Sequence, residues 1–224
     1  MKASVLFGAG WENDSVEVLW QDTGRVFCRL WRNDAEGEKH AFIPIPAGVE
    51  RPSLESVNRL TREHELKSHL DSGWALRPLE LVRERGQTML VVDYTGGEPL
   101  DRLVQQPMEI GQFLGLAVSL SRAVGQLHGR GVIHKDIKPS NVLVDSVTGR
   151  VRLTGFGIAS RLARERQPAE PPEFIAGTLA YMAPEQTGRV NRSIDSRSDL
   201  YSLGVTFYEM LTGSLPFTAT DPME

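Results

Sequence analysis

The residues with the clearest chemical potential lie between His134 and Asn141, where the chain reads HKDIKPSN. Asp136 can accept a proton, Lys138 can lie beside a phosphate, and Asn141 can offer an amide oxygen to a metal ion. Apolar runs flank this stretch on both sides, as expected for a loop between buried elements. Only a few chemistries need a base, a cation and a metal ligand so close together. The rest of the chain must supply what this loop would act on.

The composition is typical of a folded protein with an extensive core. The chain has 224 residues, of which 40% are hydrophobic and 24% charged, enough for one large or two small domains. The net charge of −4 gives no electrostatic reason to expect nucleic acid or an anionic membrane as partner. A single cysteine, Cys28, excludes an intrachain disulfide and favours a reducing compartment. With no long apolar segment and no signal-peptide pattern, we expect a cytoplasmic location.

The first hundred residues predict short strands and one helix. Segments rich in β-branched and aromatic residues alternate with turn residues, and Asp22-Thr23-Gly24 has the composition of a hairpin turn. Apolar residues at helical spacing follow Pro52-Ser53, which is a helix start signal. The predicted strands are Val16–Trp20, Val26–Trp31, Lys39–Ile45, Ala75–Val82 and Thr88–Tyr94, and the predicted helix is Leu54–Leu70.

Beyond this half the pattern becomes mainly helical. Two glycines and a proline between Tyr94 and Pro99 mark the best domain boundary. An apolar stripe that ends at Gly129 predicts one long helix, and Asp199–Leu211 predicts another. The charged, proline-containing segment Arg161–Pro172 is typical of a long exposed loop. The stripe of the first helix comprises Ile110, Phe113, Leu114, Ala117, Leu120, Val124 and Leu127, and that of the second includes Leu200, Leu203 and Phe207.

Four motifs in fixed order connect these elements to a known family. The 134–141 stretch is followed by Gly155-Phe156-Gly157, by Ala183-Pro184-Glu185, and by the DLYSLG run that starts at Asp199. In order and spacing the chain resembles the protein kinase family of the serine/threonine type. The resemblance covers nearly the whole chain and is strongest from Leu127 to Phe217. It implies an α+β, two-lobed fold with a β-rich N-lobe at 1–94, a hinge at 95–98, and a mainly helical C-lobe at 99–224 that lacks its last helices.

The resemblance also implies roles for individual residues. Asp136 corresponds to the base that receives the substrate hydroxyl proton, Lys138 to the phosphate-facing lysine, and Asn141 to a magnesium ligand. Asp199 corresponds to the aspartate that braces the loop from below, and Thr178 again suggests the serine/threonine class. ATP and Mg²⁺ are the implied cofactors. The residues expected to contact the nucleotide are Val92, Asp93, Thr95, Glu98 and Asn141.

Other positions depart from the family pattern. Gly155 stands where an aspartate normally holds the magnesium ion, and glycine has no side chain to ligate a metal. Leu19 and Gln21 stand where a phosphate-covering loop has glycines, and Ile43 stands where a phosphate-binding lysine is expected. Lys39 is the alternative cation. Without that lysine its usual partner Glu63 is expected to be solvated helix surface.

We therefore expect a pseudokinase with little or no phosphoryl transfer that acts as a regulatory or docking module for a protein partner. The motifs at 153–160 and 177–197 resemble the N-terminal kinase-like module of large bacterial multidomain sensor proteins. That resemblance suggests linkage to further signalling domains in a longer parent. An active ATP-dependent serine/threonine kinase remains the alternative, and a truncated, non-functional fragment is a second alternative.

Overall fold

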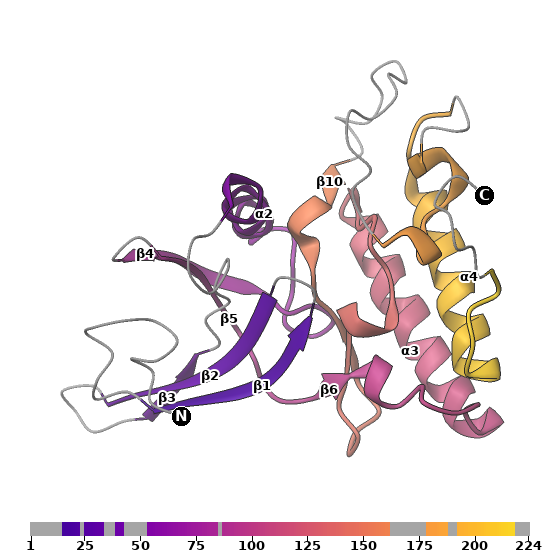
Figure 1. The fold of residues 1–224 in the computed structure, drawn as a ribbon, viewed down its shortest axis with the longest axis horizontal. Coiled ribbons are helices and arrows are strands. Elements are labelled where there is room, and N and C mark those ends of the chain that lie inside the picture. The colour runs from indigo at the N-terminus through magenta and orange to yellow at the C-terminus, as the bar shows by residue number, and fades with distance from the viewer. Residues whose placement is uncertain are drawn as a thin grey trace. The chain divides into compact units, whose positions relative to one another are not determined.

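A computed structural model describes residues 15–22, 25–33, 39–42, 53–84, 87–161, 178–187 and 192–217. The described residues form two units (Figure 1). The first contains the residues up to Ser72 and Leu76–Thr95, and the second contains Gly73–Ala75 and the residues from Gly96 onward. The predicted boundaries at 94/95 and 98/99 stay predictions. No helix in the described ranges is long and apolar enough to cross a bilayer.

The first unit begins with an antiparallel sheet in the order β1-β2-β3. Its strands are β1 (Ser15–Asp22), β2 (Arg25–Asn33) and β3 (Lys39–Phe42). The pairing of β1 with β2 continues to Asp22 opposite Arg25, with an irregularity between Val18 and Trp20. The Trp20 and Phe27 rings stack at 4.4 Å and the Phe27 side chain is fully buried. The aromatic residues that predicted these strands thus provide part of this unit's core.

A helix and a hairpin complete the first unit. Helix α2 spans Leu54–Glu65, and the Ser53 hydroxyl caps it by accepting a hydrogen bond from the Ser56 amide. It packs against β4 (Pro78–Glu84) and β5 (Gln87–Val92), which pair antiparallel. Glu63 lies on the packed face of α2 with only 1% exposure. The prediction that Glu63 is solvated helix surface is wrong, because that face of α2 is turned toward the hairpin.

Two long helices dominate the second unit. Helix α3 spans Ile110–Gly129 and α4 spans Ser196–Thr212, and they lie side by side (Figure 1). The Phe113 and Phe207 rings meet edge to face at 5.6 Å between them. Asp195 caps the start of α4, and Gly213 ends it at a φ of 68°.

Short strands and single turns hold the polar loops of the second unit. Strands β6 (Glu98–Pro99), β8 (Val142–Val144) and β9 (Val151–Leu153) form one antiparallel sheet, and β7 (Val132–Ile133) pairs with β10 (Ser160–Arg161). Strands β7 and β8 are fully or almost fully buried, so the loop between them is fixed at both ends. The 3₁₀ helices are Leu100–Arg102, Pro139–Asn141, Phe156–Ile158, Leu179–Tyr181 and Pro184–Thr187.

Most predicted elements are present, with three corrections. Helix α2 ends at Glu65 rather than Leu70, because the chain turns from Leu66 onward. Strand β4 starts at Pro78, while Ala75 forms only an isolated bridge to Leu153. Some predicted core positions on α3 and α4 are exposed, because each helix packs only one face against its neighbours. The exposed stripe residues are Ile110 at 60%, Leu114 at 54% and Leu200 at 54%. Most of the predicted loop at 161–172 lies outside the described residues.

Candidate active site

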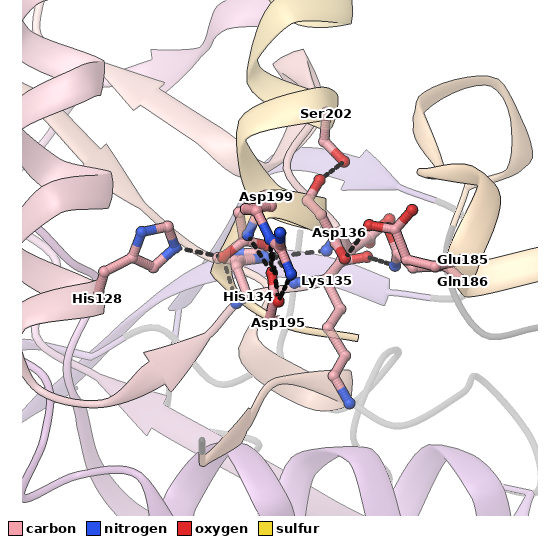
Figure 2. A network of polar contacts seen from close by, with 11 residues as sticks. His128, His134, Lys135, Asp136, Glu185, Gln186, Asp195, Asp199 and Ser202 are labelled. Carbon is pink, nitrogen blue, oxygen red and sulfur yellow. Dashed lines mark hydrogen bonds and ion pairs between the residues drawn. The ribbon is translucent and has the colours of Figure 1, made fainter. Parts of the chain in front are cut away.

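The 134–141 loop is anchored by a buried carboxylate (Figure 2). Asp199, near the start of α4, has no exposed surface. One of its oxygens accepts hydrogen bonds from the His134 amide at 2.9 Å and from His128 Nε2 at 2.7 Å, and the other accepts from the Lys135 amide at 2.8 Å. Three donors satisfy a carboxylate that would otherwise be costly to bury. The predicted bracing role of Asp199 is therefore visible as direct contacts.

His134 supports the loop from inside. Its ring is fully buried and lies 4.8 Å from the Phe156 ring. The Nε2 atom is 3.0 Å from the Thr154 carbonyl, and the Asp136 amide donates to Nδ1 at 3.3 Å. This network assigns the proton to Nε2, since Nδ1 must accept and the carbonyl needs a donor. His134 thus supports the loop structurally.

The candidate base is held in a defined orientation. Asp136 Oδ1 accepts a hydrogen bond from the Thr178 amide at 3.1 Å, and Oδ2 lies 3.7 Å from Lys138 Nζ. Lys138 Nζ donates to the Thr178 hydroxyl at 2.8 Å. The structure thus brings Asp136 and Lys138 together, as their spacing predicted, and adds Thr178 as their common partner. These contacts fix where the Asp136 carboxylate points, which is the first requirement for a general base.

Asn141 faces the position where the family aspartate would stand. Its Nδ2 donates at 2.8 Å both to the Asp136 carbonyl and to Asp136 Oδ2. Gly155 has a φ of 84°, in the left-handed region that favours glycine. A Cβ atom on Gly155 would lie 2.5 Å from Asn141 Oδ1 and 2.6 Å from its Cγ. The Asn141 amide therefore occupies the space that any side chain at 155 would need.

The residues present do not fit a magnesium ion. Mg²⁺ prefers six oxygen ligands, usually including one or two carboxylates. Gly155 offers none, Asn141 has no exposed surface, and Thr154 is fully buried with its own hydroxyl unpaired among the described residues. Across the described ranges no group of three or more His, Cys, Asp or Glu side chains could hold a metal.

The phosphate-covering positions of the first unit are also altered. Leu19 and Gln21 are part of β1, where Gln21 pairs with Val26 and Leu19 lies at the irregularity between Val18 and Trp20. Only residues 23 and 24 separate the two strands. Ile43 lies outside the described residues, as does the side chain of Lys39.

The expected adenine-contacting residues can each be located. Val92 is the last residue of β5 and is fully buried. The Asp93 amide donates to the Arg77 carbonyl at 2.8 Å, and its carboxylate accepts from the Ser72 hydroxyl at 2.5 Å. Thr95 is exposed and ends the first unit, while Glu98 is half-buried in β6 of the second. Their roles in nucleotide binding stay predictions.

Segment 178–187 attaches to the loop and to α4 through contacts that sequence reasoning missed. Gln186 Nε2 donates to the Lys135 carbonyl, and the Ser198 hydroxyl donates to Glu185 at 2.7 Å (Figure 2). The Tyr181 hydroxyl donates to Glu209 at 2.6 Å, and burial together with this bond raises the pKa of the Tyr181 phenol. These partners are far apart in sequence, so no local pattern could have identified them.

Comparisons with known proteins agree with this arrangement. A family model described as protein kinase domain matches residues 27–224. Serine/threonine-protein kinase Pkn1 of Myxococcus xanthus is 38% identical over 57% of this chain and 18% of its own length, and pkn2 of the same organism is 36% identical over 74% and 20%. PknB of Mycobacterium tuberculosis is 35% identical over 60% and 21%. The chain spans about a fifth of the length of these relatives.

Proposed function

The chain belongs to the protein kinase family, and we propose that it is a pseudokinase: a kinase-fold module that regulates or docks a protein partner without transferring phosphate. The observation that carries this proposal is the pairing of Gly155 with Asn141. The position of the metal aspartate has no side chain, and the Asn141 amide fills the adjoining space. Restoring a metal site would require a carboxylate at 155 and a different orientation of the Asn141 side chain.

The magnitudes favour loss of activity. A positioned base such as Asp136 contributes about 10²–10⁴-fold to a rate. Loss of one electrostatic stabiliser costs about 10²–10³-fold. The metal aspartate and the phosphate lysine are two such losses. If their free-energy costs are additive, together they lower a kinase rate of about 1–100 s⁻¹ by about 10⁴-fold or more. The retained base does not compensate for both.

We assign ATP as the family nucleotide, with binding that is weak and independent of metal. Backbone groups of Asp93 and Thr95, beside Val92, are the proposed adenine contacts, and Glu98 is the proposed ribose contact. These contacts need few particular side chains, so they can persist when catalysis is lost. Asn141 as a magnesium ligand stays a prediction from the family, and the burial of its side chain counts against it.

The test is the thermal shift with ATP, which should be equal with Mg²⁺ and with chelator. A shift found only with Mg²⁺ would contradict this part.

The decisive assay is transfer of radiolabelled phosphate from ATP to a generic protein substrate, in Mg²⁺ and separately in Mn²⁺. We expect no transfer above that of Asp136→Ala, which removes the base and serves as the background control. Transfer by the unmodified chain that Asp136→Ala abolishes would overturn the pseudokinase proposal.

A specific observation supports the rival function of an active serine/threonine kinase. Asp136, Lys138 and Thr178 keep a mutually bonded arrangement, which is the part of the site that handles the substrate hydroxyl. In that case Lys39 would replace the missing phosphate lysine. Lys39→Met should then abolish transfer, whereas it should have no effect on a pseudokinase.

The proposed setting is a cytoplasmic signalling protein in which this module is joined to further domains and contacts a protein partner. The third reading, a fragment without stable function, makes a separate prediction. It requires that the isolated chain lack a cooperative thermal unfolding transition. A single sharp transition would exclude it, independently of any activity.

A further inference from the structure

Gln186 uses both ends of its side-chain amide to join two distant parts of the second unit (Figure 2). Its Oε1 accepts a hydrogen bond from the Ala183 amide at 3.1 Å, and its Nε2 donates to the Lys135 carbonyl at 2.8 Å. Flipping the amide would place donor against donor and acceptor against acceptor, so its orientation is fixed. The side chain is only 4% exposed. Water cannot readily replace these bonds.

The residue that Gln186 contacts has an unusual backbone. Lys135 has a φ of 70° and is the one non-glycine residue with positive φ among the described residues. A lysine in this region carries a conformational cost and persists only where its surroundings hold it. The Lys135 amide is held by Asp199 and its carbonyl by Gln186. Both ends of the residue are therefore bound, from two different elements.

The carbonyl of Lys135 belongs to the same rigid peptide plane as the Asp136 amide. That amide donates a long hydrogen bond of 3.3 Å to His134 Nδ1. The Gln186 bond to this plane, at 2.8 Å, is shorter than the contact to His134. The plane sets the direction in which the Asp136 side chain leaves the backbone. Asp136 in turn receives the Thr178 amide. Segment 178–187 therefore contacts the 134–141 loop near both ends of the segment, through Thr178 and through Gln186.

We propose that Gln186 is a positioning residue that fixes the Lys135–Asp136 peptide and thereby the direction of the Asp136 carboxylate. It couples segment 178–187 to the 134–141 loop. This role goes beyond the proposed function, because it holds whether or not phosphate is transferred. Its failure would leave the pseudokinase proposal untouched, since the two rest on different residues.

The test is amide hydrogen exchange measured residue by residue by NMR on the whole chain. Gln186→Glu keeps the acceptor for Ala183 and removes the donor to Lys135. Exchange at Thr178, which donates to Asp136, should become about tenfold faster, as expected for one lost bond between buried groups. Exchange at Leu153, which donates to the Trp74 carbonyl in the buried core, should not change. Thr187→Val, which removes an exposed bond to Pro184 in the same turn, should alter neither amide.

Three results would overturn the proposal. The first is unchanged exchange at Thr178 in Gln186→Glu, and the second is an equal acceleration at Thr178 and Leu153, which would indicate general destabilisation. The third concerns Lys135→Gly, where glycine removes the cost of positive φ. In that background Gln186→Glu should accelerate Thr178 less, and an undiminished effect contradicts the proposal. If Gln186→Glu does not fold, Gln186→Leu is measured against the same criteria.

Discussion

Gly155→Ala tests the pairing of Gly155 with Asn141, on which the pseudokinase proposal depends. The added Cβ would meet Asn141 Oδ1 at 2.5 Å and Nδ2 at 2.9 Å, both closer than a real Cβ contact allows. Asn141 must then move, and its hydrogen bonds to Asp136 at 2.8 Å are lost or lengthened. The substitution should therefore destabilise the chain through two separate terms.

The two terms can be estimated separately. Placing alanine at a φ of 84° costs about 1–2 kcal/mol for the left-handed backbone. Displacing Asn141 adds about 2–3 kcal/mol, because one of its bonds reaches a carboxylate and leaves a buried amide unpaired. The sum is about 3–5 kcal/mol. For a chain of this size the second term alone lowers Tm by about 4–12 °C.

The assay is equilibrium urea denaturation followed by circular dichroism, with a matched glycine as control. Gly149 also has a positive φ, of 67°, but a Cβ there meets nothing within 4 Å. Gly149→Ala should therefore show only the backbone term. In an Asn141→Ala background, Gly155→Ala should lose its second term and match Gly149→Ala.

Equal costs for Gly155→Ala and Gly149→Ala in the unmodified chain would refute this reasoning. They would mean that the Asn141 side chain moves away from position 155 at no cost in stability, so that an aspartate at 155 could also be accommodated. Metal-dependent ATP binding by Gly155→Asp would have the same meaning. Either result would remove the main structural support for lost catalysis.

Three further outcomes are expected. Asp199→Ala should lower the free energy of unfolding in the same urea assay by more than about 3 kcal/mol, because three donors lose a buried acceptor. The control Asp195→Ala removes a helix cap and should lower it by only about 1 kcal/mol. Similar losses in the two variants would contradict the anchoring role of Asp199. The Arg197 side chain holds the pKa of the Asp195 carboxyl below its ordinary value. The stability that this ion pair adds is therefore complete above a pH of about 4 and is lost as the pH falls through the lowered pKa. The difference in urea midpoint between the unmodified chain and Asp195→Asn should narrow on acidification, and a constant difference would contradict the ion pair's contribution. Burial raises the pKa of the Cys28 thiol to about 11. At pH 8 iodoacetamide should therefore label Cys28 only after denaturation. Rapid labelling of the native chain would contradict the burial of this thiol.

The sequence alone identified the elements whose signals are local. The apolar periodicity and the stop at Gly129 placed α3, and the residues between Asp199 and Leu211 placed most of α4. The sequence also identified the 134–141 loop and the positions that depart from the family pattern. The residue type at a position such as 155 shows directly whether a carboxylate is present. These inferences need only residue type and spacing along the chain.

The sequence could not assign exposure to residues whose surroundings come from elsewhere. Glu63 was expected at the surface because its usual partner is missing, yet it is almost fully buried in the packed face of α2. Ile110 and Leu114 belong to an apolar stripe but lie outside the face that meets β9 and α4. Periodicity defines a face of a helix, while burial depends on which other elements reach that face.

The tertiary structure alone decided how the loop's functional groups are used. Gly155 could be read as a missing metal ligand, but only packing shows that Asn141 fills the adjoining space. The contact of Gln186 with the Lys135 carbonyl joins residues 51 positions apart. Such contacts depend on the path of the chain between them and on how α4 places segment 178–187. Residue types therefore determined the family and its missing groups, and long-range packing determined what the remaining groups hold in place.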